Sequence, residues 1–96
     1  MQQLTIRGLR LRLGVTQKEA ARHISTQKAT ISKWERGEAI PRYMYSIESL
    51  LRYYGVHLSR YDILQLQKAF DRGIDLRRIK FKVGDEIWPE KTKHTA

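Results

Sequence analysis

The 96-residue sequence contains no cysteine, which excludes disulfide bonds and thiolate metal sites. Its three histidines, His23, His57 and His94, have no spacing suited to a metal site or a catalytic triad, so surface or packing roles are expected of them. The sequence also lacks a nucleophile paired with a base, paired acids and a phosphate-cradling glycine loop. We therefore expect no enzyme, no metal and no cofactor.

Long hydrophobic runs are also missing. No stretch approaches the roughly 20 apolar residues that span a bilayer, and the N-terminus lacks the regions of a secretion signal. A cytoplasmic protein with no membrane partner is expected. With 41% apolar residues, the chain still carries enough hydrophobic material to fold, and its length suits one domain with a small or shared core.

Acidic residues are few, since ten Asp and Glu face 19 Lys and Arg and leave a formal net charge of +9. Residues 1–60 hold 11 basic and 4 acidic side chains, a surplus of seven, whereas residues 61–96 hold 8 and 6, a surplus of two. The N-terminal part is therefore expected to bind a polyanion. Charge alone does not separate DNA from RNA or an anionic membrane.

Hydrophobic periodicity predicts helices in the first half of the chain. Ile6, Leu9 and Leu13 share one face of a first helix over 4–13, which Gly14 ends.

A capping box formed by Thr16 and Glu19 predicts a second helix from about residue 17. Polar residues 25–27 interrupt the pattern, and a third helix is predicted over Gln27–Arg36.

Two more helices are predicted further along. The fourth carries a stripe that stops at Gly55, formed by Ile47, Leu50, Leu51 and Tyr54. The fifth begins at the cap pair Ser59 and Asp62, ends near Gly73, and carries Ile63, Leu66 and Phe70 on one face.

The period then changes to two, because Ile79, Phe81 and Val83 alternate with lysines. Gly84-Asp85 is a credible turn into 86–88, so a β-hairpin is predicted, with a polar, frayed segment after Pro89. We divide the chain into a helical domain over 1–72 and a C-terminal extension over 73–96, a hairpin or an extended tail that could dimerise or bind a partner.

Two short helices joined by a tight turn are typical of a helix-turn-helix. The residues that carry the pattern are Ile6-Arg7, Arg10, Gly14, Thr16-Gln17, Glu19, Ala21, Thr30 to Gly37, Pro41, Leu50-Leu51 and Gly55-Val56. In order and spacing, residues 6–56 resemble the phage-repressor family of Cro, lambda-type repressors and the XRE group. The resemblance implies a mainly α fold, a lambda-repressor-like five-helix domain whose third helix reads bases.

The resemblance also implies which residues read bases: Gln27, Lys28, Ala29 and Lys33. Their chemistry is complementary to base edges, because Gln pairs with adenine, Lys donates to guanine, and Ala packs on a thymine methyl group. For each lysine the alternative is a contact with phosphate alone.

Phosphate contacts are expected from a second set: Gln17, Thr30, Ser32, Arg36 and Arg42. The alternative for Gln17 is an exposed solubilising side chain. Thr30 and Ser32 could instead bond back to a carbonyl one turn earlier, and the two arginines could simply be solvated.

Other residues of the motif are expected to hold the fold. Arg10 and Glu35 match a family pair that bridges the first and third helices, and Ile31 and Trp34 are expected in the core. The turn departs from the family pattern, with Ser25 in place of the usual glycine and Thr26 in place of an apolar residue. This departure predicts a reshaped turn and a tilted third helix.

The implied function is a transcription regulator that binds double-stranded DNA as a homodimer, most readily a repressor on a palindromic operator. Apolar residues outside the motif are dimer candidates: Ile63, Leu66, Phe70, Ile79, Phe81, Val83 and Trp88. The alternative is that they cap the monomer core. A rival function is an antitoxin, which would bind a protein toxin and autoregulate its operon.

Overall fold

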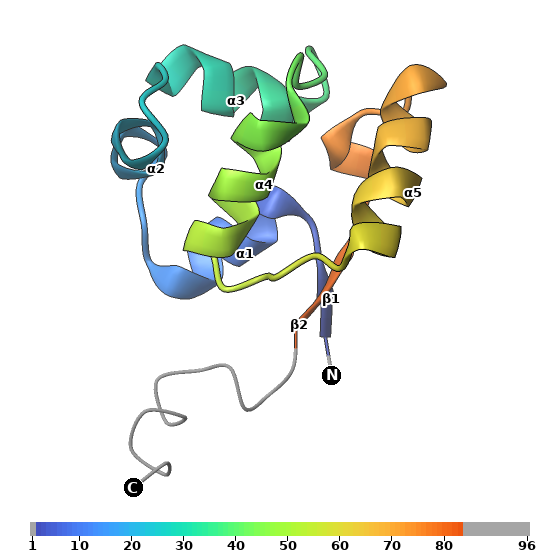
Figure 1. The fold of residues 1–96 in the computed structure, drawn as a ribbon. Helices are drawn as coiled ribbons and strands as arrows, with labels where there is room; N and C mark the ends of the chain where they lie inside the picture. Colours follow the sequence, from blue (N-terminus) through green and yellow to red (C-terminus); the bar gives the residue numbers. More distant parts are fainter. Residues whose placement is uncertain (1, 84–96) are drawn as a thin grey trace, which may run out of the picture.

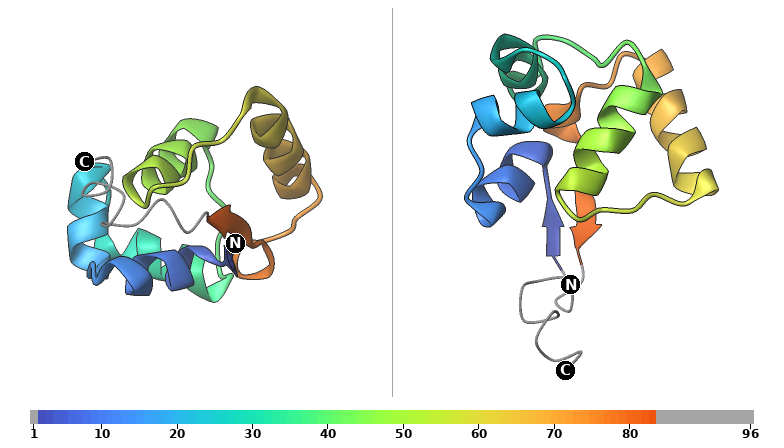
Figure 2. Two further views of the ribbon diagram at one scale, coloured as in Figure 1. Left: turned by 90° about the horizontal axis from the view of Figure 1, so that it is seen from below. Right: turned by 60° about the vertical axis from the view of Figure 1, so that its left-hand side comes forward.

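The computed structural model describes residues 2–83, and this part is mainly helical (Figure 1). Its elements follow in the order β1 (Gln2–Leu4), α1 (Ile6–Leu13), α2 (Gln17–His23), α3 (Lys28–Arg36), α4 (Met44–Tyr53), α5 (Arg60–Asp71), the 3-10 helix η1 (Leu76–Arg78) and β2 (Phe81–Val83). Figure 2 shows α1, α2 and α3 on one side of the molecule and α4 and α5 on the other. None of the helices between residues 2 and 83 has the length and apolar character needed to cross a membrane.

Side-chain caps fix where the helices begin. The Thr16 hydroxyl accepts from the Glu19 amide at 3.0 Å, and the Glu19 carboxylate accepts from the Thr16 amide at 2.8 Å. The bond from the Thr16 amide to the Glu19 carboxylate is the main cause that holds the pKa of Glu19 below its usual value. Ser59 and Asp62 form the same reciprocal box before α5, so both predicted capping boxes are confirmed.

The N-terminus differs from the prediction, which started the first helix at Leu4. Leu4 lies in β1, and α1 begins at Ile6 because the Thr5 hydroxyl accepts from the Gly8 amide at 3.2 Å. β1 pairs with β2 in antiparallel register, with Gln2 opposite Val83 and Leu4 opposite Phe81. The strand predicted near Phe81 is therefore present, but among the described residues it pairs with the start of the chain. The predicted return strand over 86–88 and the segment after Pro89 lie outside the described residues.

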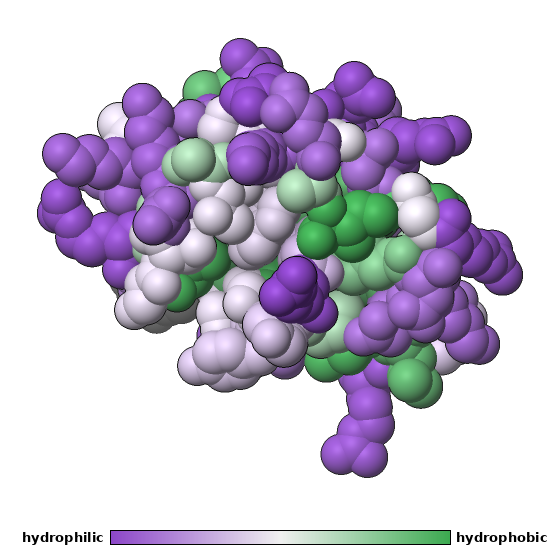
Figure 3. Space-filling model, turned by 90° about the horizontal axis from the view of Figure 1, so that it is seen from above, coloured by the Kyte–Doolittle hydropathy of each residue, from purple (hydrophilic) through white to green (hydrophobic). Residues whose placement is uncertain are grey.

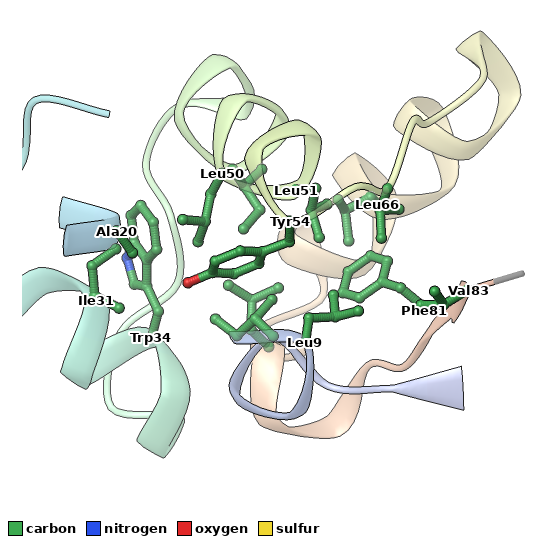
Figure 4. Close-up of a cluster of buried hydrophobic side chains, with 14 of the residues drawn as sticks. Leu9, Ala20, Ile31, Trp34, Leu50, Leu51, Tyr54, Leu66, Phe81 and Val83 are labelled. Atoms are coloured by element: carbon green, nitrogen blue, oxygen red, sulfur yellow. The ribbon is translucent and has the colours of Figure 1, made fainter. Parts of the chain in front are cut away.

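One hydrophobic cluster joins all the helices (Figure 4). Its side chains come from the predicted stripes, including Leu9 of α1, Ile31 of α3 and Leu50 of α4, all at most 1% exposed. Leu76 of η1 is fully buried in the same cluster, and burying a leucine contributes about 1.5–3 kcal/mol. The segment after α5 thus completes the core and sets η1 against α3.

Candidate nucleic-acid interface

The turn between α2 and α3 contains a residue in the left-handed region. Ser25 has φ +57°, the one non-glycine residue with positive φ between residues 2 and 83. The Thr26 amide donates to the Ala21 carbonyl at 2.8 Å and closes the turn. Serine therefore occupies the left-handed conformation that glycine adopts most readily. A left-handed conformation costs a non-glycine residue about 1–2 kcal/mol.

The two faces of α3 differ sharply. The buried face carries Ile31, Trp34 and Glu35, which have 0%, 5% and 6% of their surface exposed. The predicted base-reading residues lie on the opposite side, where Lys28, Ala29 and Lys33 are exposed, as is Gln27, the residue that precedes the helix. Gly37, with φ +75°, then ends the helix.

A buried polar network fixes the orientation of α3. The Arg10 guanidinium donates from Nε to Glu35 Oε2 at 2.6 Å and from a terminal nitrogen to Glu35 Oε1 at 3.0 Å. Arg10 also donates to the Val15 carbonyl at 2.9 Å, and Gln17 Nε2 donates to Glu35 Oε1 at 3.0 Å. The bond with Glu35 raises the pKa of Arg10. Glu35 of α3 is thereby tied to both α1 and α2.

The residues predicted to contact phosphate differ in how exposed they are and in whether they already have a hydrogen-bond partner. Arg42 is exposed just before α4, and Thr30 and Ser32 are half-buried on α3. Arg36 already holds the Glu38 carboxylate through two bonds of 2.7 and 2.8 Å and donates to the Ser32 hydroxyl. This pairing lowers the pKa of Glu38. A phosphate would therefore have to compete with Glu38 for Arg36, whereas no such exchange is needed at Arg42.

The apolar residues offered as dimer candidates lie mostly inside the monomer. Leu66, Phe70 and Phe81 are only 6–8% exposed and belong to the core cluster, the alternative that the sequence left open. Ile63 is half-buried, and Trp88 lies outside the described residues. The outer face of α5 instead exposes Tyr61 and Leu64, at 68% and 57%.

Sequence reasoning did not single out two exposed tyrosines beside Arg42. Tyr43 and Tyr45 are 65% and 77% exposed at the start of α4. Both lie off the apolar stripe of that helix, which is the signal that could have identified them as surface residues. Figure 3 looks down on the end of the molecule that carries α3, where hydrophilic side chains line much of the rim.

No ligand set for a metal is present among residues 2–83, because no three His, Cys, Asp or Glu side chains gather there. The arrangement instead offers an exposed, cationic short helix held by a buried ion pair. In comparison with known proteins, residues 4–62, more than half of the chain, match the helix-turn-helix domain family. Neither the curated proteins nor the solved structures gave a match.

Proposed function

The chain belongs to the helix-turn-helix domain family, and from this we propose that it is a transcription regulator that binds double-stranded DNA sequence-specifically through α3. The observation that carries the proposal is the exposed side of α3, where Lys28, Ala29 and Lys33 face away from the core. An α-helix with its side chains is about 10–12 Å wide, which fits the major groove of B-form DNA, about 12 Å across.

We assign base recognition to Gln27, Lys28, Ala29 and Lys33. The first three stand at the opening of α3, and Lys33 lies further along the exposed side of the same helix. Each well-placed contact with a base edge is worth about 1–3 kcal/mol of discrimination.

Phosphate binding is assigned to Gln17 and Arg42. Gln17 is the first residue of α2, where the helix dipole favours an anion. Its Nε2 donates one hydrogen to Glu35, and the amide carries a second hydrogen that can donate to phosphate. The same side chain would then link the DNA backbone to the residue that orients α3.

We further propose a homodimeric repressor on a palindromic operator. Two copies of α3 about 34–36 Å apart would enter successive major grooves on one side of the duplex. The resemblance of residues 6–56 to phage repressors supports this role. So does the outer face of α5, where exposed Tyr61 and Leu64 provide apolar surface for a second copy.

Selection of bound sequences from a pool of random duplexes tests the proposal. We expect enrichment of a two-fold symmetric site with half-site centres about 10 base pairs apart, and a solution mass of two chains. Enriched sequences that compete no better than bulk genomic DNA would contradict sequence-specific binding. A monomeric mass on the enriched duplex would contradict the dimer alone.

A further inference from the structure

η1 lies against the C-terminal end of α3, in a segment beyond the matched residues 4–62. The contact is close at Gly37, where a Cβ atom would lie 2.9 Å from Asp75 Cγ and 3.1 Å from Arg77 Nε. Asp75 and Arg77 therefore cover the residue that ends α3. Glycine at this position permits both the positive φ and the approach of η1.

The segment that contains η1 is strongly basic. Residues 72–83 carry five basic side chains and one acidic one, whereas α5 carries two of each. Residues 61–96 together have a surplus of only two, because residues 61–71 and residues 84–96 each carry one more acidic than basic side chain. The surplus follows directly after a helix with no net charge and lies beside α3.

Arg77 and Arg78 are exposed, and within residues 2–83 neither belongs to an ion pair. Asp75, the acidic residue of this segment, uses Oδ1 to accept from the Arg77 backbone amide at 2.9 Å. At the same end of α3, Arg36 is held by Glu38. The guanidinium groups of η1 are thus better placed to accept a new anion than Arg36 is.

We propose that Arg77 and Arg78 bind phosphodiester groups of duplex DNA beside the C-terminal end of α3. This inference rests on the proposed function, and it extends the DNA-binding surface beyond the helix-turn-helix domain. The contacts carry no base specificity, because phosphate is the same at every base pair. They hold the protein on the backbone next to the groove that α3 enters.

The test uses the full chain, a fluorescein-labelled duplex and a series of salt concentrations, with binding followed by anisotropy. Each phosphate contact contributes about −0.9 to the slope of log K against log salt, so Arg77→Gln with Arg78→Gln should make this negative slope shallower by about 1.8. The matched control is Arg60→Gln with Lys68→Gln on α5, which removes the same charge and should leave the slope near that of the unchanged protein.

A second variant, Arg77→Lys with Arg78→Lys, keeps both charges and should keep the slope; it also separates phosphate binding from a purely structural role of η1. An unchanged slope in the glutamine variant, or an equal loss in the α5 control, would overturn the inference while the unchanged protein still binds DNA. Failure of the unchanged protein to bind any duplex would overturn the proposed function as well.

Discussion

The buried and exposed sides of α3 belong to one nine-residue helix but are organised in opposite ways. On the buried side, Glu35 accepts three hydrogen bonds, two from Arg10 and one from Gln17. On the exposed side, Lys28 and Lys33 form no ion pair with any residue of the described part. The buried side fixes orientation and the exposed side remains available, so stability and DNA recognition should respond to different substitutions.

The largest expected effect comes from breaking the buried side. Arg10→Ala leaves the Glu35 carboxylate buried without its charge partner, and such a loss lowers the free energy of unfolding by about 3–5 kcal/mol. Urea unfolding followed by circular dichroism measures the change. The matched control is Arg52→Ala, which breaks the exposed pair with Glu48 at 3.2 Å and should lower stability by only about 0.2–0.5 kcal/mol. Equal losses in the two variants would show that burial of the Arg10 pair has no energetic consequence.

A substitution on the exposed side of α3 should weaken DNA recognition and leave stability nearly unchanged. Lys33→Ala is expected to leave stability within about 0.5 kcal/mol, because Lys33 is exposed and belongs to no ion pair among residues 2–83. It should reduce discrimination at one base pair of the selected site by about 1–3 kcal/mol. Competition assays with single-base variants of that site measure the loss, with Lys68→Ala on α5 as the control. A uniform weakening at every position would reassign Lys33 to phosphate.

Tyr54 lies in the core beneath α3, and its hydroxyl points towards Trp34 and Ile31 (Figure 4). Tyr54 is 2% exposed, and within residues 2–83 its hydroxyl has no hydrogen-bond partner. Tyr54→Phe removes this unsatisfied group and should raise the free energy of unfolding by about 1–2 kcal/mol. A loss of stability in thermal unfolding would mean that the hydroxyl is satisfied in solution.

The same residue predicts a pH dependence. Burial raises the pKa of Tyr54 above its usual value near 10, because the charged phenolate is disfavoured in the core. The folded chain therefore holds the phenol proton more tightly than the unfolded chain does, so the titration of Tyr54 leaves stability unchanged below pH about 10 and lowers it as pH rises further. Unfolding midpoints measured on both sides of that pH should decline less in Tyr54→Phe than in the unchanged protein. Parallel declines would exclude Tyr54 as the titrating group.

The sequence predicted well wherever the signal was local. The stripe that buries Ile47, Leu50 and Leu51 and the capping boxes at Thr16 and Ser59 depend on residues at most a few positions apart. The pairing of β1 with β2 joins residues about 80 positions apart, and the three residues of β1 show no alternation that would have identified it as the partner strand.

In the candidate site, too, some features were predictable from the sequence and others depended on contacts between side chains. The exposed positions of Lys28 and Lys33 were implied by the resemblance to phage repressors, whereas the engagement of Arg36 by Glu38 required coordinates, since a sequence does not show which of two partners an exposed arginine takes. The placement of Arg77 over Gly37 likewise depends on where η1 docks.

The turn that joins the two helices gives the smallest expected effect. Ser25→Gly removes the left-handed strain of about 1–2 kcal/mol but adds backbone entropy to the unfolded chain, so a net gain of about 0.5–1 kcal/mol is expected. The matched control, Ser49→Gly within α4, should lose about 0.5–1 kcal/mol because that position is regular helix. DNA affinity should not change with Ser25→Gly, since glycine accepts the same φ and leaves α3 in place. A gain in affinity without a gain in stability would instead mean that Ser25 tilts the exposed side of α3 away from its best fit in the groove.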